Sequence, residues 1–245
     1  MIGLSYLGDA LISWKQIAPL YQASANPEVT GLPEFAVKPS QDQTLIEAHN
    51  LIFRYQNRVE PTIRGCSLHI KAGDRILLEG PSGGGKSTLT SLLTGLRLPE
   101  SGLLLINGLD RQTLGEKGWR HRITAAPQFH ENHVFTEAFA FNLLMGRRWP
   151  PNPDDLKEAE EICHELGLGE LLNRMPAGMM QTVGETGWQL SHGEKSRLYI
   201  ARALLQKSEL IVLDESFASL DPETLAQSML CVLKRANTLF VIAHP

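Results

Sequence analysis

One short segment, from Gly80 to Ser87, restricts the fold of this chain more than any other. It reads GPSGGGKS and matches the pattern G-x-x-x-x-G-K-[ST], in which a glycine-rich loop binds phosphate groups. The apolar run Arg75–Glu79 before it predicts a strand, and the pattern after it predicts a helix that begins near Lys86. A strand, a glycine loop and a helix in this order predict an α/β nucleotide-binding domain.

Each part of the loop has a predicted task. Glycines let the backbone curl so that consecutive N–H groups point at phosphate oxygens, and the following helix adds its positive end. Lys86 reaches the β- and γ-phosphates, and the Ser87 hydroxyl binds Mg²⁺. The predicted cofactors are therefore ATP and Mg²⁺. The ATP-binding residues predicted here are Gly80, Pro81, Ser82, Gly83, Gly84, Gly85, Lys86, Ser87 and Thr88.

Two helices can be placed from apolar spacing. After the loop, apolar residues recur at helical spacing, namely Leu89, Leu92, Leu93 and Leu96. A second helix should begin after Asn152, an N-cap residue followed by Pro153 and two acids. Its apolar face is Leu156, Ala159, Ile162, Cys163 and Leu166, and Gly167 can end it.

Two continuous apolar runs, Leu210–Leu213 and Leu239–Ala243, predict parallel strands buried on both faces. Ligands of such sheets bind at the carboxyl ends of the strands, where Asp214, Glu215 and His244 follow. Asp214 should lie near the metal, and Glu215 should polarise the attacking water as a general base. His244 should reach the γ-phosphate. An ordinary acidic turn and a structural histidine are the alternatives.

A second anion-binding helix end is predicted at Leu190–Glu194. Ser191 and Glu194 have the spacing of a capping box, and an apolar-periodic helix follows. A helix start of this kind attracts anions. Within one subunit it has no evident task, because the first loop already holds the triphosphate.

With these segments together, the chain resembles the ATP-binding domain of ABC transporters. Leu190–Glu194 is similar to the LSGGQ signature, and Phe53–Tyr55 to the aromatic A-loop. Gln128 stands where the Q-loop glutamine is expected, and Ser219–Asp221 resembles the D-loop. The resemblance covers roughly Leu45–His244.

The resemblance implies a P-loop NTPase of the α/β class, with a RecA-like core, an antiparallel β sub-domain and an α-helical signature sub-domain at about residues 129–205. The ATP-binding domain would span residues 45–245. Residues 1–44 would be an N-terminal extension or linker, which could form the tail of a membrane domain. Family members usually continue beyond the histidine that corresponds to His244, so we expect this chain to be truncated at its C-terminus.

The family pairs two such domains head to tail, as a homodimer or a heterodimer. The resemblance implies that Ser191, His192, Gly193 and Glu194 face the ATP of the other subunit, with Asp221 acting across the interface. The catalytic set would be Glu215, His244 and Gln128, the metal ligands Ser87, Gln128 and Asp214, and Tyr55 would stack on adenine. His192 replaces the usual second glycine of the signature, and Glu194 the usual glutamine; we expect activity to survive both changes.

Two weaker similarities favour an exporter. Val183–Glu185 resembles the X-loop, and Ile12–Tyr21 resembles the end of an exporter's last membrane helix. The predicted partners are transmembrane domains, at the cytoplasmic face of the cell (inner) membrane. The alternatives are a separate ATPase subunit of another ABC system, and a soluble ABC ATPase acting on DNA or ribosomes. The last class should carry long coiled-coil insertions or a second cassette, and neither is visible.

Composition narrows the remaining classes. The net charge of −4, without a basic cluster, argues against a nucleic-acid partner. The three cysteines, Cys66, Cys163 and Cys231, fit no disulfide or metal-ligand spacing and are expected to be core residues of a protein in a reducing compartment. No apolar stretch reaches the ~18 to 20 residues that span a bilayer.

Overall fold

The computed structural model describes Trp14 and residues 44–126 and 133–243. The strands are β1 (Thr44–Phe53), β2 (Ile63–Lys71), β3 (Arg75–Glu79), β4 (Ser101–Ile106), β5 (Ile123–Ala126), β6 (Leu210–Asp214) and β7 (Thr238–Ala243). The helices are α2 (Lys86–Leu93), α3 (Arg111–Arg122), α4 (Phe139–Leu143), α5 (Pro153–Glu165), α6 (Gly169–Arg174), α7 (His192–Leu205) and α8 (Pro222–Arg235), with a 3-10 turn, η2, at Gly178–Met180.

A parallel sheet in the order β3-β7-β6-β5 forms the centre of the molecule. Every residue of β6 is buried, as is every residue of β7 up to Ile242, so the two predicted apolar strands are confirmed. Because the strands run parallel, their carboxyl ends reach the same edge of the sheet. That edge carries both Gly80 and Glu215, which follow β3 and β6 directly.

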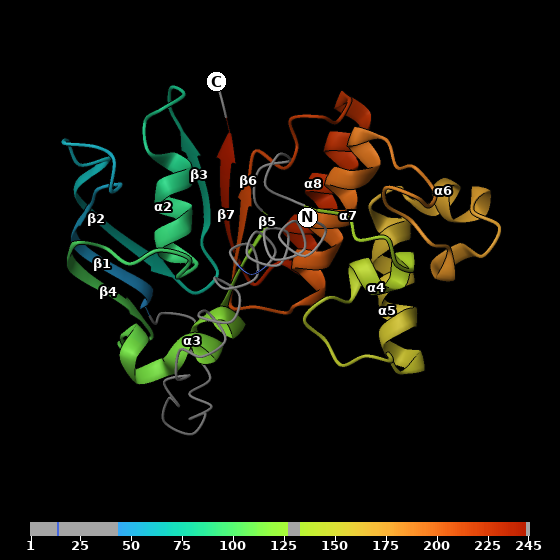
Figure 1. Cartoon of the computed structure of the whole chain (residues 1–245), viewed down its shortest axis with the longest axis horizontal. Helices are drawn as coiled ribbons and strands as arrows, with labels where there is room; N and C mark the ends of the chain where they lie inside the picture. The colour runs from blue at the N-terminus through green and yellow to red at the C-terminus, as the bar shows by residue number, and fades with distance from the viewer. Residues whose placement is uncertain (1–13, 15–43, 127–132, 244–245) are drawn as a thin grey trace, which may run out of the picture.

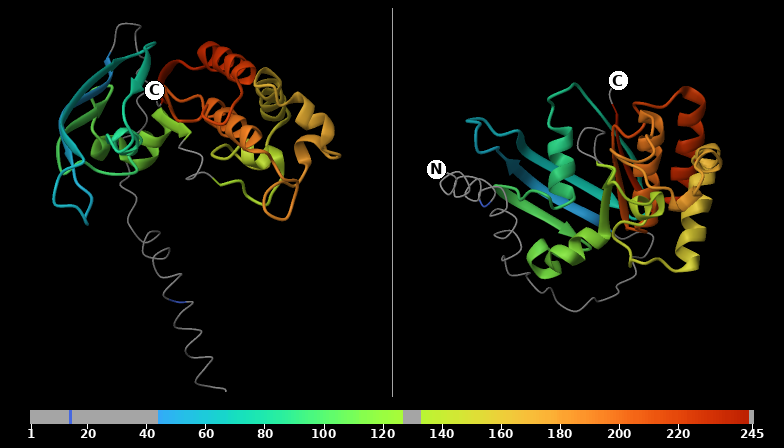
Figure 2. Two further views of the ribbon diagram at one scale, coloured as in Figure 1. Left: turned by 90° about the horizontal axis from the view of Figure 1, so that it is seen from above. Right: turned by 45° about the vertical axis from the view of Figure 1, so that its right-hand side comes forward.

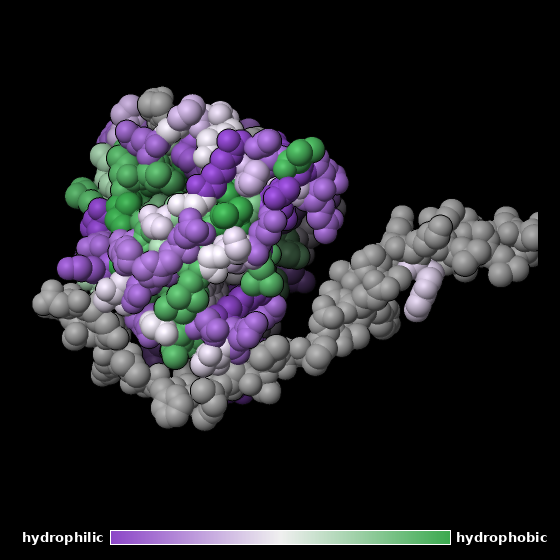
Figure 3. Space-filling view, turned by 90° about the vertical axis from the view of Figure 1, so that its left-hand side faces the viewer, coloured by the Kyte–Doolittle hydropathy of each residue, from purple (hydrophilic) through white to green (hydrophobic). Residues whose placement is uncertain are grey.

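A second, antiparallel sheet in the order β2-β1-β4 lies at one end of the molecule (Figure 1). Its central strand β1 buries Leu45, Ile46, Ala48, Leu51 and Phe53, whereas β2 alternates between buried or half-buried and exposed side chains. Alternation of this kind is typical of a sheet with one wet face. Figure 3 shows that side of the molecule as a mainly hydrophilic surface with separate hydrophobic patches.

Two buried clusters hold these layers together. The first joins β1, α2 and one face of the parallel sheet, with Trp119 of α3 at its base. The second joins the other face of that sheet to α7 and α8, and continues into α4, α5 and α6. Figures 1 and 2 show the result: the antiparallel sheet at one end, the helical region at the other, and the parallel sheet between them. This is the predicted fold, and it is confirmed.

The α7–α8 layer does not reach the edge strand β3. Leu213, Val241 and Leu77 are register partners across β6, β7 and β3, so their side chains point to the same face. Their exposure rises along the row, from 0% to 7% to 57%. The face is therefore covered over β6 and β7 and open over β3.

The helix after the phosphate loop ends earlier than its leucine spacing predicts. α2 stops at Leu93, Gly95 takes a φ of +72°, and Leu96, which continues the helical spacing, lies beyond the helix and is exposed. A Cβ atom at Gly95 would also lie 2.8 Å from Cδ1 of Trp119, so both the backbone turn and the packing of α3 require glycine.

The predictions for α5 are confirmed. The Asn152 side chain accepts a hydrogen bond from the Asp155 N–H, Pro153 is the first helical residue, and Gly167 follows the helix with a φ of +72°. Ala159, Ile162, Cys163 and Leu166 are buried as predicted, and Leu156 packs at the cluster edge.

The cysteines behave as expected from their spacing. Cys163 and Cys231 are buried and Cys66 is half-buried, all three as free thiols. Burial raises the pKa of Cys163 to about 12, and burial next to the Glu165 carboxylate does the same for Cys231. Neither thiol is poised to react.

The N-terminal extension or linker predicted for residues 1–44 falls almost wholly outside the described residues and stays a prediction. Among the helices of the described residues, none is long and apolar enough to cross a membrane.

Candidate nucleotide-binding site

The phosphate loop follows β3 and bends sharply into α2. Gly83 and Gly85 take φ values of +79° and +86°, a conformation that side chains with a Cβ rarely adopt. At Gly85 the space is also restricted: a Cβ would lie 3.0 Å from Cδ1 of Ile63 and 3.3 Å from the carbonyl oxygen of Thr62. The loop therefore needs these glycines both for its backbone and for its packing.

Lys86 is the first residue of α2 and folds back over the loop. Its Nζ donates to the carbonyl oxygens of Gly80, at 2.6 Å, and Pro81, at 3.0 Å. The ammonium is thus held directly above the concave side of the loop. A triphosphate would offer it anionic acceptors in place of these neutral carbonyls, and charge-assisted hydrogen bonds are the stronger kind.

A cleft of about 290 Å³ opens at this edge of the sheet. It brings together residues that are far apart in the chain, including Tyr55, Lys86 and Glu215. The full lining is Tyr55, Arg58, Thr62, Ser82, Gly83, Gly85, Lys86, Ser87, Thr88 and Glu215. Arg58 and Thr62 were missed from sequence; the only available signal was their position in the turn after the aromatic Tyr55.

Tyr55 is fixed in place by three neighbours. Its hydroxyl bonds the Thr88 hydroxyl at 3.1 Å, which ties the ring to α2. Phe53 meets the ring edge to face, with centroids 5.0 Å apart. The guanidinium carbon of Arg97 lies over the ring, 4.7 Å from its centroid. Tyr55 lines the cleft whereas Arg97 does not, so we place Arg97 behind the ring. Sequence patterns gave no hint of Arg97.

The two carboxylates lie at the end of β6. Asp214 is the last residue of the strand and is 2% exposed; it lies within the strand rather than just past it. Glu215 donates its backbone N–H to the carbonyl oxygen of Ile242 at 3.0 Å and has a φ of +51°. A left-handed backbone at a residue other than glycine is strained, and such strain is concentrated at functional sites. It turns the Glu215 side chain into the cleft.

The oxygen donors at this edge suit Mg²⁺. The Ser87 hydroxyl lines the cleft and the buried Asp214 carboxylate lies at the end of the neighbouring strand. Mg²⁺ prefers hard oxygen ligands and is usually held by one or two protein groups together with substrate phosphates. The residues present therefore fit this ion.

The predicted capping box of the signature segment is present. Ser191 Oγ accepts from the Glu194 N–H at 3.2 Å, and Glu194 Oε2 accepts from the Ser191 N–H at 2.7 Å. The other oxygen of Glu194 forms an ion pair with Arg174. His192 is exposed as the first residue of α7, and a Cβ on Gly193 would make only ordinary contacts.

Asp221 is the N-cap of α8. Its Oδ1 accepts from the Thr224 N–H at 3.0 Å, and this bond holds the pKa of the exposed Asp221 carboxyl below its usual range. The Asp221–Pro222 pair is a helix-start signal that sequence analysis read only as part of the D-loop. Ser219 lies against the signature helix, bonding Ser196 at 2.7 Å.

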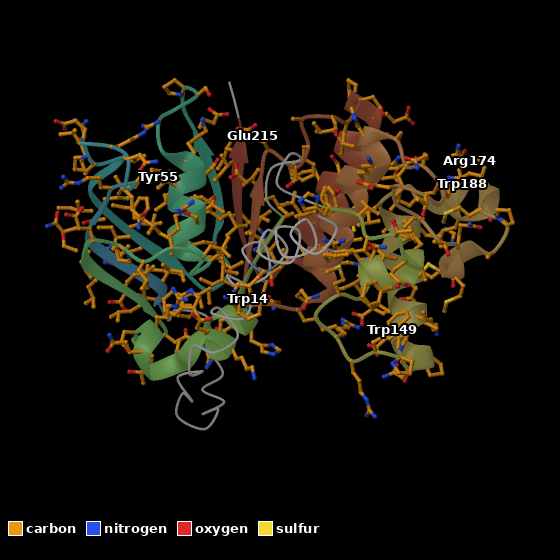
Figure 4. The ribbon with its side chains drawn as sticks, viewed as in Figure 1. Trp14, Tyr55, Trp149, Arg174, Trp188 and Glu215 are labelled. Atoms are coloured by element: carbon orange, nitrogen blue, oxygen red, sulfur yellow. The ribbon has the colours of Figure 1, made fainter. Side chains whose placement is uncertain are left out.

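The signature end of α7 does not join the cleft of its own chain. Neither Ser191 nor Gly193 lines that cleft. Figure 4 shows Tyr55 and Glu215 on the side of α2 and the central sheet, whereas Arg174, next to the signature cap, lies far across the molecule in the helical region. Gln128 and His244 lie outside the described residues.

Comparison with known proteins decides the family. The family profile described as "ABC transporter" matches residues 63–218, more than half of the chain. This chain belongs to the ABC transporter family. The matched domain binds ATP, and the family's members are generally ATPases, which agrees with the cleft around Lys86.

The proteins similar to this chain are named as a transporter, a flippase and an exporter. The chain is 34% identical over 97% of its length to "ABC transporter B family member 29, chloroplastic" from Arabidopsis thaliana, covering 38% of that protein. It is 38% identical over 81% of its length to an "ATP-dependent lipid A-core flippase" from Nitrosococcus oceani, covering 33% of it. A solved "bacterial Atm1-family ABC exporter with ATP bound" matches 99% of the chain at 28% identity and a TM-score of 0.75, with 42% of that chain covered. The chain thus spans well under half of these relatives.

Proposed function

We propose that this chain is the ATP-hydrolysing domain of an ABC exporter and powers the transport of a substrate across a membrane. The observation that carries the proposal is the division of one phosphate site between two places. The cleft holds the phosphate loop and Glu215, whereas the capped helix end at Ser191 lies elsewhere in the same chain. A second, inverted domain would bring that helix end to the cleft. Similar proteins named as a transporter, a flippase and an exporter support the transport role.

In this proposal each residue of the cleft has one task. The loop amides and Lys86 hold the β- and γ-phosphates, and Tyr55 stacks on the adenine. Ser87 and Asp214 would hold Mg²⁺, which neutralises the charge that develops on the transferred phosphoryl group. Glu215 polarises the attacking water and accepts its proton. Gln128 as a further metal ligand and His244 as a γ-phosphate contact stay predictions.

The partner domain would complete the site. Ser191 can donate its hydroxyl proton to the γ-phosphate held by the other subunit, because a hydroxyl that accepts one hydrogen bond still has its donor available. Transmembrane domains would be the remaining partners, at the cytoplasmic face of the membrane. The transported substrate would be selected there. A stand-alone ATPase subunit of another ABC system is the second candidate, and the similarity to a solved ABC exporter over 99% of the chain argues against it.

The proposal is tested with Glu215→Gln, which removes the base and keeps the size of the side chain. We expect turnover to fall by at least about 100-fold, as for loss of a general base, while MgATP still binds. Closed dimers should then accumulate, because hydrolysis no longer separates them. The measurements are phosphate release and sedimentation with and without MgATP. Unaltered hydrolysis, or a chain that stays monomeric with MgATP, would contradict the proposal.

A further inference from the structure

The signature cap of this chain carries a charge that the family pattern lacks. Glu194 stands where the resemblance leads one to expect glutamine. Glutamate and glutamine can both close a capping box, because the cap needs only a side-chain oxygen that accepts a hydrogen bond from the Ser191 N–H. Glu194 makes this bond at 2.7 Å. The carboxylate therefore adds a negative charge to the cap without adding a hydrogen bond to it.

That charge lies where the proposed function needs a positive potential. The N-terminus of a helix is equivalent to roughly half a positive charge, which attracts a phosphate. A carboxylate in the first turn stabilises the helix but opposes an incoming γ-phosphate. The side chain of Glu194 is only 11% exposed, so water screens its charge weakly.

Arg174 compensates the carboxylate. It is the last residue of α6, and its Nη2 donates to Glu194 Oε1, while Oε2 stays in the cap. The two oxygens of Glu194 thus have two different partners. The carboxylate is therefore held between the Ser191 N–H of its own cap and the guanidinium of Arg174 on α6.

Arg197 also lies near the cap and interacts electrostatically with Glu194, but its guanidinium donates its hydrogen bonds to the carbonyl oxygens of Gly193, at 3.2 Å, and Gly167, at 2.7 Å. Both arginines line a polar cavity of about 370 Å³ together with Glu170, Glu194 and Glu223. Three carboxylates face two guanidiniums there, an excess of one negative charge. Without Arg174 the excess would be two.

We propose that Arg174 is a positioning residue for the site in trans: it neutralises Glu194 and holds it in the cap, so that the start of α7 can accept the γ-phosphate of a nucleotide bound by a second copy of this chain. The inference rests on the proposed function. The effect of Arg174 concerns only the nucleotide bound in the cleft of the second copy, because Arg174 is remote from the cleft of its own chain.

The test compares four variants in the Glu215→Gln background, in which ATP-driven dimers accumulate. Arg174→Ala should raise the MgATP concentration for half-maximal dimerisation about two- to fivefold, the usual weight of one charge at a helix end. Glu194→Gln should lower that concentration, because it removes the opposing charge. The double variant should return at least to the parent value. Arg120→Ala is the matched control: Arg120 is 60% exposed and paired with Glu116, compared with 58% for Arg174, but it lies on α3.

One further readout separates charge from folding. Affinity of the monomer for a fluorescent ATP analogue should not change in Arg174→Ala. An ion pair needed only for folding would be lost equally in both single variants and in the double variant. Equal defects in all three, or no defect in Arg174→Ala, would overturn the inference. Failure of the parent to dimerise with MgATP would instead remove the proposed function.

Discussion

At the scale of single residues, the cleft depends on side chains that their neighbours hold in place. The Lys86 ammonium donates to two carbonyl oxygens of the loop. The Tyr55 ring is held by a hydrogen bond to Thr88 and by the guanidinium of Arg97 against its face. Such support restricts the rotamers of the two binding residues before a ligand arrives. Binding then costs less conformational entropy, which is the physical meaning of preorganisation.

Arg97→Ala should weaken nucleotide binding only by weakening the contact between Tyr55 and the adenine. A guanidinium behind an aromatic ring contributes about 0.5–1 kcal/mol at an exposed site, so we expect roughly a two- to fivefold loss of ATP affinity. Calorimetry measures the affinity for ATP, which has both adenine and phosphates, and for tripolyphosphate, which has phosphates alone. Tripolyphosphate has no base, and its affinity should not change. An equal loss for both ligands would place Arg97 at the phosphates instead.

At the scale of elements, α5 is attached to α8 through one carboxylate. Glu165, the last residue of α5, accepts from Lys234 at 2.8 Å, pairs with Arg235, and accepts from the Cys231 thiol at 3.4 Å. Because α8 packs with the central sheet and α5 belongs to the helical region, these bonds couple the two regions. The Arg235 bond is the main reason that the pKa of Glu165 is lowered to about 2 from an ordinary 4.5.

Glu165→Gln should destabilise the domain in a pH-dependent way. A carboxyl whose pKa is lower in the folded state stabilises the fold fully above its unfolded-state pKa, near 4.5, and this contribution falls as the pH drops towards about 2. We expect a loss of about 1–3 kcal/mol in the free energy of unfolding at pH 7. Urea unfolding of both proteins from pH 7 to pH 4 measures it, with Glu116→Gln on α3 as control. A difference that grows as the pH falls would contradict this account.

At the scale of the whole molecule, the cleft and the signature end of α7 belong to opposite parts of one chain (Figure 4). The rigid parallel sheet and the buried cluster around α7 separate them. A phosphate site that uses both must therefore come from two chains in a head-to-tail pair, related by a twofold axis. The proposed division at residues 1–44 and 45–245 stays a prediction.

Mixing two inactive variants tests this arrangement. Lys86→Ala disables the cleft, and Gly193→Asp places a negative charge at the signature end of α7. In a mixed head-to-tail dimer one site combines both defects and the other contains neither. An equimolar mixture should thus recover roughly a quarter of the parent ATPase activity, since half of the dimers carry one intact site. Each variant alone is the control, and a mixture as inactive as its components would exclude shared sites.

The sequence by itself determined the features that depend on neighbours within a few positions. The glycine bend before Lys86, the caps at Asn152 and Ser191, and the buried strands β6 and β7 were all predictable, because local hydrogen bonds and apolar periodicity decide them. The packing of Trp119 from α3 against Gly95 was not, since no local pattern connects these two residues.

Only the tertiary structure decided which distant groups meet. Tyr55 joins Thr88, Glu194 joins Arg174 and Glu165 joins Arg235 across separations of 33, 20 and 70 positions. No spacing rule connects residues so far apart, because their contact depends on how the layers of the fold pack. The phosphate loop could therefore be predicted from the sequence. The residues that support Tyr55 beside the adenine, and the arginine that compensates the Glu194 carboxylate, could be found only in the folded molecule.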